Sequence, residues 1–500
     1  MTSKQEQSPA ATAVPDTVEN YVGGEWVSVD SDDGQPLVNP ATNETLAEVP
    51  FSDEETVDAA VQTANETFDE WSRTPPVERV QYLFDLKSEL EDRQEDIAQA
   101  LTREHGKTLD EARGEIRRGI ENVEVAAGIP NMLREGSGNV QDVAQGMDEH
   151  AIRQPLGVFT AITPFNFPAM IPLWFLPYAV ATGNTFVLKP SEKVPLSSQI
   201  IFEAIDAVDF PDGVVNLVNG GVDTVNALLE HEDIEGVSFV GSTPVARHIY
   251  ETSAKHGKRV QAQGGAKNYA VVSEDAELDE AVPNVIGSVY GNAGQRCLAN
   301  DVVVGVGDSY EPLREEVLDA VDDLTVGNGL EEDTDVGPLI TGESAERVKG
   351  MIEDAIDEGA DLVVDGRDFE HPDYPDGNFL GPTLLEGVTT DMDITQTEIF
   401  GPVMALTKAD DIDEAIEMVN STQYGNASSL YTENGAEARK YRYEVDAGNI
   451  GINVGVCAPM GFFHFGGRKD SFFGDLHAQG EDAINFYTDK TITIERYYSH

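Results

Sequence analysis

The feature that most constrains the fold is an alternation of short strand-like and helix-like segments between residues 157 and 242. Four segments with many β-branched residues predict strands, at 157–165, 184–191, 214–220 and 236–242. Two segments with apolar residues at three- and four-residue spacing predict helices, at 196–208 and 222–231. Such an alternation predicts βαβ units and a parallel sheet. Ligands of these sheets bind at the carboxyl ends of the strands, where Asn166, Lys189, Gly220 and Ser242 fall.

The rest of the chain extends this α/β pattern. Residues 54–134 have helical periodicity, and a second αβ region follows from about 301 to 440. The alternating tail INFYTDKTITIERYY predicts a terminal strand, which needs a pairing partner such as another subunit. Residues 1–17 are polar and predict a disordered arm.

The charge of the chain excludes several classes of partner. It has 92 acidic and 32 basic residues, a formal net charge of −60, and the acidic residues are spread along the whole sequence. We therefore expect no binding to nucleic acid or to an anionic membrane surface, because both would repel this protein. Self-repulsion of this size is tolerated where salt screens it, which predicts a halophilic source with a high-salt cytoplasm.

Composition also bears on location and on metals. The most apolar stretch, residues 168–183, is short and contains three prolines, so it does not predict a membrane span. The N-terminus has no apolar signal region, and we expect a cytoplasmic protein. The nine histidines have no HExxH or HxxxH spacing and the two cysteines form no CxxC, so no metal site is predicted.

Cys297 is the first candidate catalytic residue. It lies in YGNAGQRCLAN, residues 290–300, among small and polar residues and directly after Arg296. A reactive thiolate needs an electropositive, partly open site, and Arg296 offers adjacent positive charge. These local features leave catalytic and structural roles equally open. The other cysteine, Cys457, has apolar neighbours and is interpreted as packed and inert.

Three strand ends carry further candidates. Asn166 in TPFNFPAM could donate a hydrogen bond to a developing oxyanion, or it could form an ordinary asparagine turn. KPSEK at 189–193 suits the hydroxyls of a nucleotide ribose, although a solvated charged turn has the same composition. FVGSTPVARHI at 239–249 is half of a phosphate-binding motif, since no complete GxGxxG is present.

Taken together, these motifs resemble the aldehyde dehydrogenase superfamily over about residues 20 to 495. The shared features are strand-NFP, strand-KPSE, strand-GS, the cysteine loop and TEIFGPV at 397–403, in that order and spacing. The resemblance implies a Rossmann-type NAD-binding domain (18–134 and 154–264) and an αβ catalytic domain (265–455). It also implies a small β oligomerisation element (135–153 and 470–500).

The resemblance also implies roles for single residues. Cys297 would be the nucleophile that forms a thiohemiacetal, with Asn166 and the Cys297 backbone N–H as the oxyanion hole. The residues expected to bind NAD are Thr163, Phe165, Lys189, Glu192, Lys193, Ser242, Glu398 and Phe400. A carboxylate at Glu192 would repel a 2′-phosphate, which favours NAD over NADP.

One departure from the superfamily pattern is informative. Hydrolytic members usually carry a glutamate about 34 residues before the cysteine, which activates water. Here that position is Gln263, and residues 261–263 are Gln, Ala and Gln. A glutamine cannot act as a general base at neutral pH, so the thioester must leave by another route.

GGAKN at 264–268 resembles the CoA-acylating methylmalonate-semialdehyde dehydrogenase branch, as do residues 117–128 and 461–493. In that branch coenzyme A takes the acyl group from the cysteine. Arg118 and Arg296 match arginines that hold the substrate carboxylate there, which suits guanidinium chemistry. For Arg118 a surface charge is the alternative, since Arg117 is equally available.

The expected reaction converts methylmalonate semialdehyde or malonate semialdehyde, with NAD and CoA, to propanoyl-CoA or acetyl-CoA. One alternative is a hydrolytic semialdehyde dehydrogenase, for example for 2,5-dioxopentanoate, which gives a free acid. The other is a non-catalytic binding protein, which would fail to bind NAD or would have a Cys297 thiol that resists alkylation. A homo-oligomer, tetramer or dimer, is expected.

Overall fold

The computed structural model describes residues 14–133 and 138–498. Its first sheet has eight strands in the order β2-β1-β9-β8-β7-β10-β11-β21. These are β1 (Asn20–Val22), β2 (Glu25–Val27), β7 (Val158–Ile162), β8 (Thr185–Lys189), β9 (Val215–Leu217), β10 (Ile234–Val240), β11 (Arg259–Gln263) and β21 (Phe472–Gly474). The five strands from β9 to β11 run parallel. The chain adds β8 and β9 on one side of β7 and then β10 and β11 on the other, so the switch point lies between β7 and β10.

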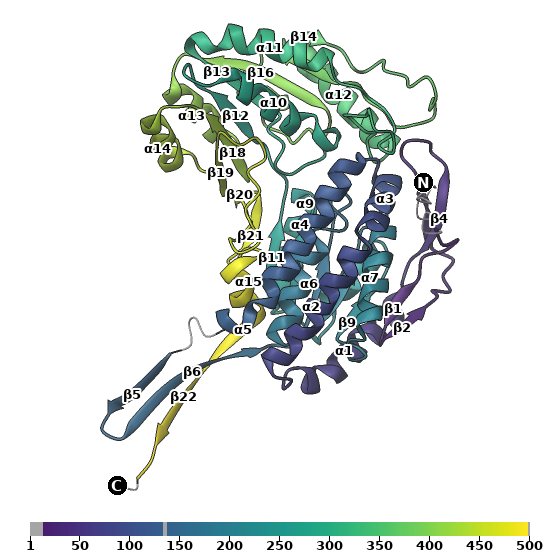
Figure 1. The fold of residues 1–500 in the computed structure, drawn as a ribbon, viewed down its shortest axis with the longest axis vertical. Helices are drawn as coiled ribbons and strands as arrows, with labels where there is room; N and C mark the ends of the chain where they lie inside the picture. Colours follow the sequence, from purple (N-terminus) through teal and green to yellow (C-terminus); the bar gives the residue numbers. More distant parts are fainter. Residues whose placement is uncertain (1–13, 134–137, 499–500) are drawn as a thin grey trace, which may run out of the picture.

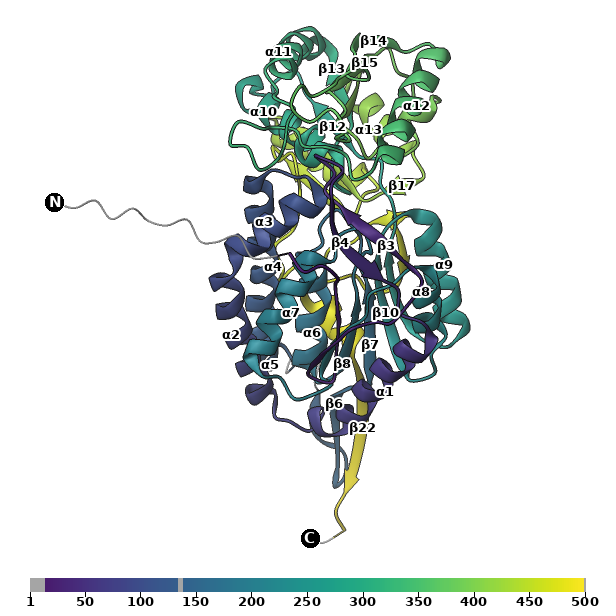
Figure 2. The ribbon, with the colours of Figure 1, turned by 90° about the vertical axis from the view of Figure 1, so that its right-hand side faces the viewer.

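Helices cover both faces of this sheet (Figure 2). On one face lie α1 (Glu54–Trp71), α8 (Val222–Glu230) and α9 (Thr243–Lys255), which share a core with Val158, Val187 and Val237. On the other face lie α2 (Pro76–Asp92), α3 (Gln94–His105), α4 (Leu109–Ala127), α5 (Ile129–Met132), α6 (Pro172–Thr182) and α7 (Leu196–Val208). Successive strand residues point to opposite faces, so Phe159 and Phe186 belong to this second core.

The second sheet has seven strands in the order β14-β15-β16-β13-β12-β18-β19 and lies above the first in Figure 1. They are β12 (Tyr269–Val272), β13 (Val302–Val306), β14 (Asp361–Val364), β15 (Thr383–Glu386), β16 (Val403–Ala409), β18 (Ala427–Tyr431) and β19 (Asn449–Ile452). All pairs are parallel except β14 with β15. The helices of this domain are α10 (Leu278–Val289), α11 (Tyr310–Asp322), α12 (Gly342–Glu358), α13 (Ile412–Asn420) and α14 (Gly435–Glu444).

A three-stranded antiparallel sheet projects from the body (Figure 1). It consists of β5 (Asn139–Ala144), β6 (Met147–Pro155) and β22 (Thr488–Arg496), and β22 pairs with the whole of β6. Its side chains Ile152, Ile492 and Ile494 are exposed. Two short pairs complete the fold: β3 (Gly34–Val38) with β4 (Thr45–Pro50), and β17 (Tyr424–Gly425) with β20 (Arg468–Lys469).

The predicted fold class is confirmed, and the predicted strands and helices between 157 and 242 correspond to β7–β10, α7 and α8. Residues 470–500, predicted to belong to the oligomerisation element, are divided among three elements. Residues 472–474 form β21 at the edge of the first sheet. The helix α15 (Gly480–Tyr487) packs on α6, and the buried rings of Phe486 and Tyr487 contact Phe159 of β7. Only β22 enters the projecting sheet.

The predicted N-terminal arm falls mostly on residues 1–13, which lie outside the described residues. Thr17 forms a bridge with Glu48, so the described end of that segment is attached to the body. In the two described stretches of the chain, we find no helix with the length and apolarity needed to cross a membrane.

Candidate active site

Cys297 lies in the loop between α10 and β13, at the amino end of the second sheet. The Cys297 carbonyl accepts hydrogen bonds from the side-chain amides of Asn268 at 2.9 Å and Asn426 at 2.6 Å. Both asparagines directly precede strands, β12 and β18. Upstream, Asn292 and Ala293 adopt left-handed backbone angles with φ of 55° and 51°. Such a conformation is unfavourable for alanine and persists only where its surroundings impose it.

Asn166 reaches this loop from the carboxyl end of β7. Its Nδ2 donates a hydrogen bond to the carbonyl of Gln295 at 3.0 Å, two residues before Cys297. Its Oδ1 is buried without a hydrogen-bond partner among the described residues. The structure therefore brings Asn166 of the first domain to the loop that carries Cys297, the predicted nucleophile, in the second. An ordinary asparagine turn would not require this contact.

The Cys297 thiol does not lie in the electropositive environment that we expected. Burial raises its pKa to about 12, and the nearby Glu398 carboxylate adds to the effect. The expectation was wrong because the positive charge of Arg296 is paired with Glu111 at 2.8 Å, and burial dominates the pKa of the thiol. Cys457 is also a free thiol, and burial raises its pKa to about 11.

The raised pKa of Cys297 predicts how the free protein reacts with iodoacetamide. The thiolate is the reacting form, so the alkylation rate should rise about tenfold per pH unit from about pH 7 to pH 10 without a plateau. Mass spectrometry of the peptide containing Cys297 measures this rate. A plateau near neutral pH would contradict the expected environment. Because slow alkylation is expected in either case, it does not distinguish a catalytic chain from a non-catalytic one.

A cavity of about 390 Å³ opens beside Cys297. It is lined by residues of α4, the segment 167–174, the cysteine loop and the segment 456–465, including Arg118, Arg296, Phe167, Trp174 and Phe465. Arg118 and Arg296 therefore line the same cavity as Cys297. Arg117, the other candidate on α4, instead pairs with Glu91, Glu121 and Glu124.

Each cavity arginine already has an acidic partner. Arg296 Nη2 contacts Glu111 at 2.8 Å, and Nη1 donates to the Gly287 carbonyl at 3.0 Å. Arg118 Nη1 contacts Glu121 at 3.1 Å, while Nη2 donates to the Ala458 carbonyl at 3.1 Å. A guanidinium has five N–H donors, so both retain donors for a ligand. They are held in place rather than free.

Gly291 has a specific function in this arrangement. A Cβ at this residue would lie 2.6 Å from Arg296 Nη1, so any side chain would displace the guanidinium. The glycine next to the cysteine loop thus makes room for Arg296.

The predicted cofactor residues gather at the switch point of the first sheet. Lys189 and Glu192 form an ion pair of 3.0 Å. Burial opposes ionisation of Glu192, but the neighbouring Lys189 and Lys193 hold its pKa below its usual value. The hydroxyl of Thr163 is buried without a partner among the described residues. Ser242 begins α9, and its side chain makes no capping hydrogen bond.

Two aromatic rings and a carboxyl complete this group. The ring of Phe165 packs edge-on against Phe400 at 5.8 Å, and Lys193 Nζ lies 5.5 Å from the Phe165 ring centre. Phe400 has a φ of 53°, a strained value for a bulky residue. Glu398 is half-buried, and burial raises the pKa of its carboxyl to about 8.

Gln263 ends β11 and is buried. Its Nε2 donates to the carbonyl of Phe465 at 3.1 Å, so its amide has a structural role at the cavity wall. Of the three side chains at 261–263, none carries a carboxyl.

Several residues near the site were missed by the sequence analysis. Glu111, Glu115 and Lys107 connect α4 and its N-terminal turn to the loops that carry Cys297 and Asn166. Only the spacing of Glu111, Glu115 and Arg118, which places them on one helix face, could have indicated this. Val222 and Val245, in the first turns of α8 and α9, are 75% and 43% exposed. Exposed apolar side chains at helix starts give no distinctive sequence signal.

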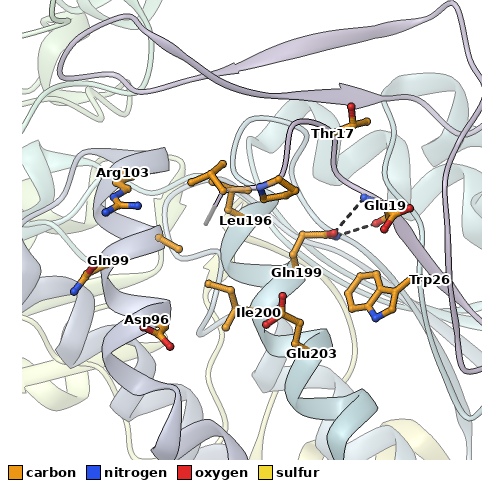
Figure 3. Close-up of a pocket in the computed structure, with 13 residues that line it drawn as sticks. Thr17, Glu19, Trp26, Asp96, Gln99, Arg103, Leu196, Gln199, Ile200 and Glu203 are labelled. Carbon is orange, nitrogen blue, oxygen red and sulfur yellow. Dashed lines mark hydrogen bonds between the residues drawn. The ribbon is translucent and has the colours of Figure 1, made fainter. Parts of the chain in front are cut away.

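A second cavity of about 260 Å³ lies between the N-terminal segment, α3 and α7. Figure 3 shows Gln199 bridging to the backbone of Glu19 across it, with Trp26 and Glu203 alongside. None of its lining residues is a predicted site residue.

Comparison with known proteins agrees with this geometry. The sequence profile of the aldehyde dehydrogenase family matches residues 26–492, and the chain belongs to that family. A malonate-semialdehyde dehydrogenase of Halalkalibacterium halodurans is 46% identical over 488 residues, covering 98% of this chain and 100% of that protein. Malonate-semialdehyde dehydrogenase 2 of Geobacillus kaustophilus is 46% identical over 481 residues, covering 96% and 99%.

Two solved structures are similar over nearly the whole chain. A methylmalonate-semialdehyde dehydrogenase of Oceanimonas doudoroffii superposes with a TM-score of 0.95 at 40% identity, covering 97% of this chain and 99% of that one. A protein of Sinorhizobium meliloti assigned the same activity, solved with NAD, also has a TM-score of 0.95 at 40% identity, with 97% and 98% covered.

Proposed function

We propose that this protein oxidises malonate semialdehyde or methylmalonate semialdehyde with NAD and passes the acyl group to coenzyme A. The observation that carries the proposal is the cavity that Cys297, Arg118 and Arg296 line together. An aldehyde at the thiol and a carboxylate at the guanidiniums describe a short semialdehyde acid. The names of the similar proteins support the same substrate class.

The chain's own residues account for the acylation half of the reaction. The Cys297 sulfur attacks the aldehyde carbon, and the thiol proton must leave before or during the attack. Asn166 Nδ2 and the Cys297 N–H donate to the developing oxyanion. In the free protein the Asn166 side chain makes one hydrogen bond, from Nδ2 to the Gln295 carbonyl. Its Oδ1 has no partner among the described residues. NAD, when bound, accepts the hydride, and the substrate is then held as a thioester on Cys297.

The groups at the switch point fit NAD. Val222 and Val245 are exposed in the first turns of α8 and α9, and their side chains offer apolar surfaces for adenine. A 3.0 Å hydrogen bond between His248 and Asn226 joins these two helices. The unpartnered Thr163 hydroxyl and the Lys189–Glu192 pair supply polar groups for the ribose and phosphates. Glu398 would bind the hydroxyls of the nicotinamide ribose. Ligands bind at this position in open α/β sheets.

Glu192 should set the preference for NAD over NADP. Its ionised carboxylate would repel a 2′-phosphate, and like charges in contact cost several kcal/mol, so Glu192→Ser should improve kcat/KM for NADP by about tenfold or more. Steady-state assays with both nucleotides check this, with kcat on NAD as the control. An unchanged preference would show that another residue discriminates.

Coenzyme A is proposed as the acyl acceptor because Gln263 supplies no base for water. Its amide is bonded to Phe465, and a glutamine does not take up a proton at neutral pH. A thiol acceptor removes the need to activate water. Its thiolate attacks the thioester, the new carbon–sulfur bond replaces the bond to Cys297, and Cys297 leaves as a thiolate. The carboxylate of the malonyl or methylmalonyl group is lost as CO₂, and a proton takes its place on carbon, giving acetyl-CoA or propanoyl-CoA.

A substrate series tests the proposed specificity. Malonate semialdehyde, methylmalonate semialdehyde, 2,5-dioxopentanoate and propanal should be compared by NADH formation. The two short semialdehyde acids should have the highest kcat/KM. A preference for 2,5-dioxopentanoate would favour the hydrolytic alternative, and a failure to bind NAD would favour the non-catalytic one.

Two further proposals concern the environment of the protein. The exposed isoleucines of β6 and β22 suit a contact with a second copy, so a homo-oligomer, tetramer or dimer, is proposed. The net charge of −60 supports a cytoplasmic protein of a halophile, with no nucleic acid or membrane partner.

A further inference from the structure

We propose that Lys107 and Glu115 are positioning residues that hold Asn166 in place for oxyanion binding. The inference rests on the proposed function, because it gives the pair a role in acylation through Asn166.

The pair makes hydrogen bonds to both ends of residues 166–170, which we call the Asn166 loop. Lys107 Nζ donates to the Asn166 carbonyl at 2.7 Å and contacts Glu115 Oε2. Glu115 Oε1 accepts the backbone N–H groups of Ala169 at 2.9 Å and Met170 at 3.1 Å. The backbone from Asn166 to Met170 is therefore bonded at both ends by one ion pair.

The ring of Phe167 closes this arrangement. Lys107 Nζ lies 4.4 Å from the centre of that ring, a distance that allows cation–π attraction. Phe167 also lines the cavity beside Cys297. The ammonium group thus contacts a ring that lines the cavity, and its partner Glu115 lines the cavity as well.

The backbone around Lys107 is itself fixed. Gly106 has a φ of 95°, and a Cβ on Gly329 of the second domain would lie 2.2 Å from the Lys107 carbonyl oxygen. The Leu109 N–H donates to the Gly329 carbonyl at 3.0 Å. The segment that carries Lys107 therefore packs directly against the domain that carries Cys297. Because Lys107 also bonds to Asn166, this contact couples the position of Asn166 to that domain.

Stability alone does not explain this pair. Both side chains are 0% exposed, and an ion pair in such a place is often no more stable than apolar residues of the same size. Its geometry instead serves the loop, since four of its contacts fix the position of Asn166 and its neighbours. An amide that must meet an oxyanion gains from such support because a shift of about 1 Å can cost about a hundredfold in rate.

The test uses the double variant Lys107→Met/Glu115→Gln in the full-length protein. It leaves no unpaired buried charge, and the glutamine oxygen can still accept from Ala169 and Met170. Arg314→Met/Glu386→Gln, which removes a 2.6 Å ion pair from the second domain, is the matched control. Thermal unfolding shows that each variant is folded, and iodoacetamide labelling shows that Cys297 is intact.

The measured quantity is the rate of NADH formation in the first turnover with malonate semialdehyde. Asn166→Ala should lower it by about 10²–10³-fold, the usual effect of losing an oxyanion donor. The double variant should lower it by about 10–10²-fold, yet by less than about twofold when Asn166 is already alanine. The control should match the unaltered protein.

Three outcomes would overturn the inference, and they separate it from the proposed function. If Asn166→Ala does not slow the first turnover, Asn166 does not bind the oxyanion, and the positioning role of Lys107 and Glu115 is contradicted as well. If Asn166→Ala slows it but the double variant does not, only the positioning role falls. An equal loss in both backgrounds would mean that the pair acts through something other than Asn166.

Discussion

Replacing Cys297 with alanine should reduce NAD-dependent aldehyde oxidation by at least about 10⁴-fold, because no covalent intermediate can form. NAD binding should be retained, since most of the proposed cofactor groups follow strands of the first sheet, whereas the cysteine lies in the loop before β13 of the second. Rapid mixing with an excess of enzyme measures both quantities. The thioester itself should be detectable by mass spectrometry in the unaltered protein when no acyl acceptor is supplied.

The other thiol provides the matched control. Cys457→Ala should retain most of the activity, because Cys297 lines the cavity and Cys457 is not among its lining residues. Substantial turnover in Cys297→Ala, or a loss of activity confined to Cys457→Ala, would contradict the assignment of the nucleophile.

Removing a cavity arginine should cost about a hundredfold in kcat/KM for malonate semialdehyde. Arg296→Met should have the larger effect, since it removes a donor and leaves Glu111 unpaired beside the substrate carboxylate. Arg118→Met leaves Glu121 in a similar but more exposed position. Propanal has no carboxylate, so its oxidation should change much less in either variant.

Arg117→Met is the control for these two variants. Arg117 is the neighbour of Arg118 on α4, but its partners are Glu91, Glu121 and Glu124. It should leave the ratio of the two substrates unchanged. If Arg118→Met and Arg296→Met slow propanal as much as malonate semialdehyde, these arginines support the loops and do not select the substrate.

The parts of the fold that follow local patterns were predictable from the sequence. The strands at β7, β8, β9 and β10 contain β-branched residues between clear breaks, and their order implies a parallel sheet. Cys297 and Asn166 could be singled out because each lies in a distinctive short motif. The structure adds that Asn166 reaches the Cys297 loop across 129 residues of sequence.

Charge pairing could not be predicted in the same way. Arg296 was expected to face the thiol because it is its neighbour in sequence, yet its guanidinium meets Glu111, 185 residues away. Side chains of adjacent residues point in different directions, so adjacency says little about contact. Lys107 and Glu115 were missed for the same reason, because they contact the Asn166 loop across more than 50 residues of sequence.

The division of residues 470–500 among β21, α15 and β22 could not be predicted from the sequence either. The resemblance implied a single oligomerisation element from 470 onwards. The rings of Phe486 and Tyr487 are buried against Phe159, whereas the side chains of Ile492 and Ile494 are exposed. Aromatic composition does not distinguish a ring that packs on its own domain from a strand that leaves it.

The most direct test of the account is the fate of the acyl group. Malonate semialdehyde should be incubated with NAD in about 2 M KCl, which screens the acidic surface, with and without coenzyme A. We expect steady NADH formation only with coenzyme A, together with acetyl-CoA and CO₂, and at most one turnover without it. Steady turnover to a free acid without coenzyme A would show that water reaches the thioester despite Gln263, and it would contradict the proposed function.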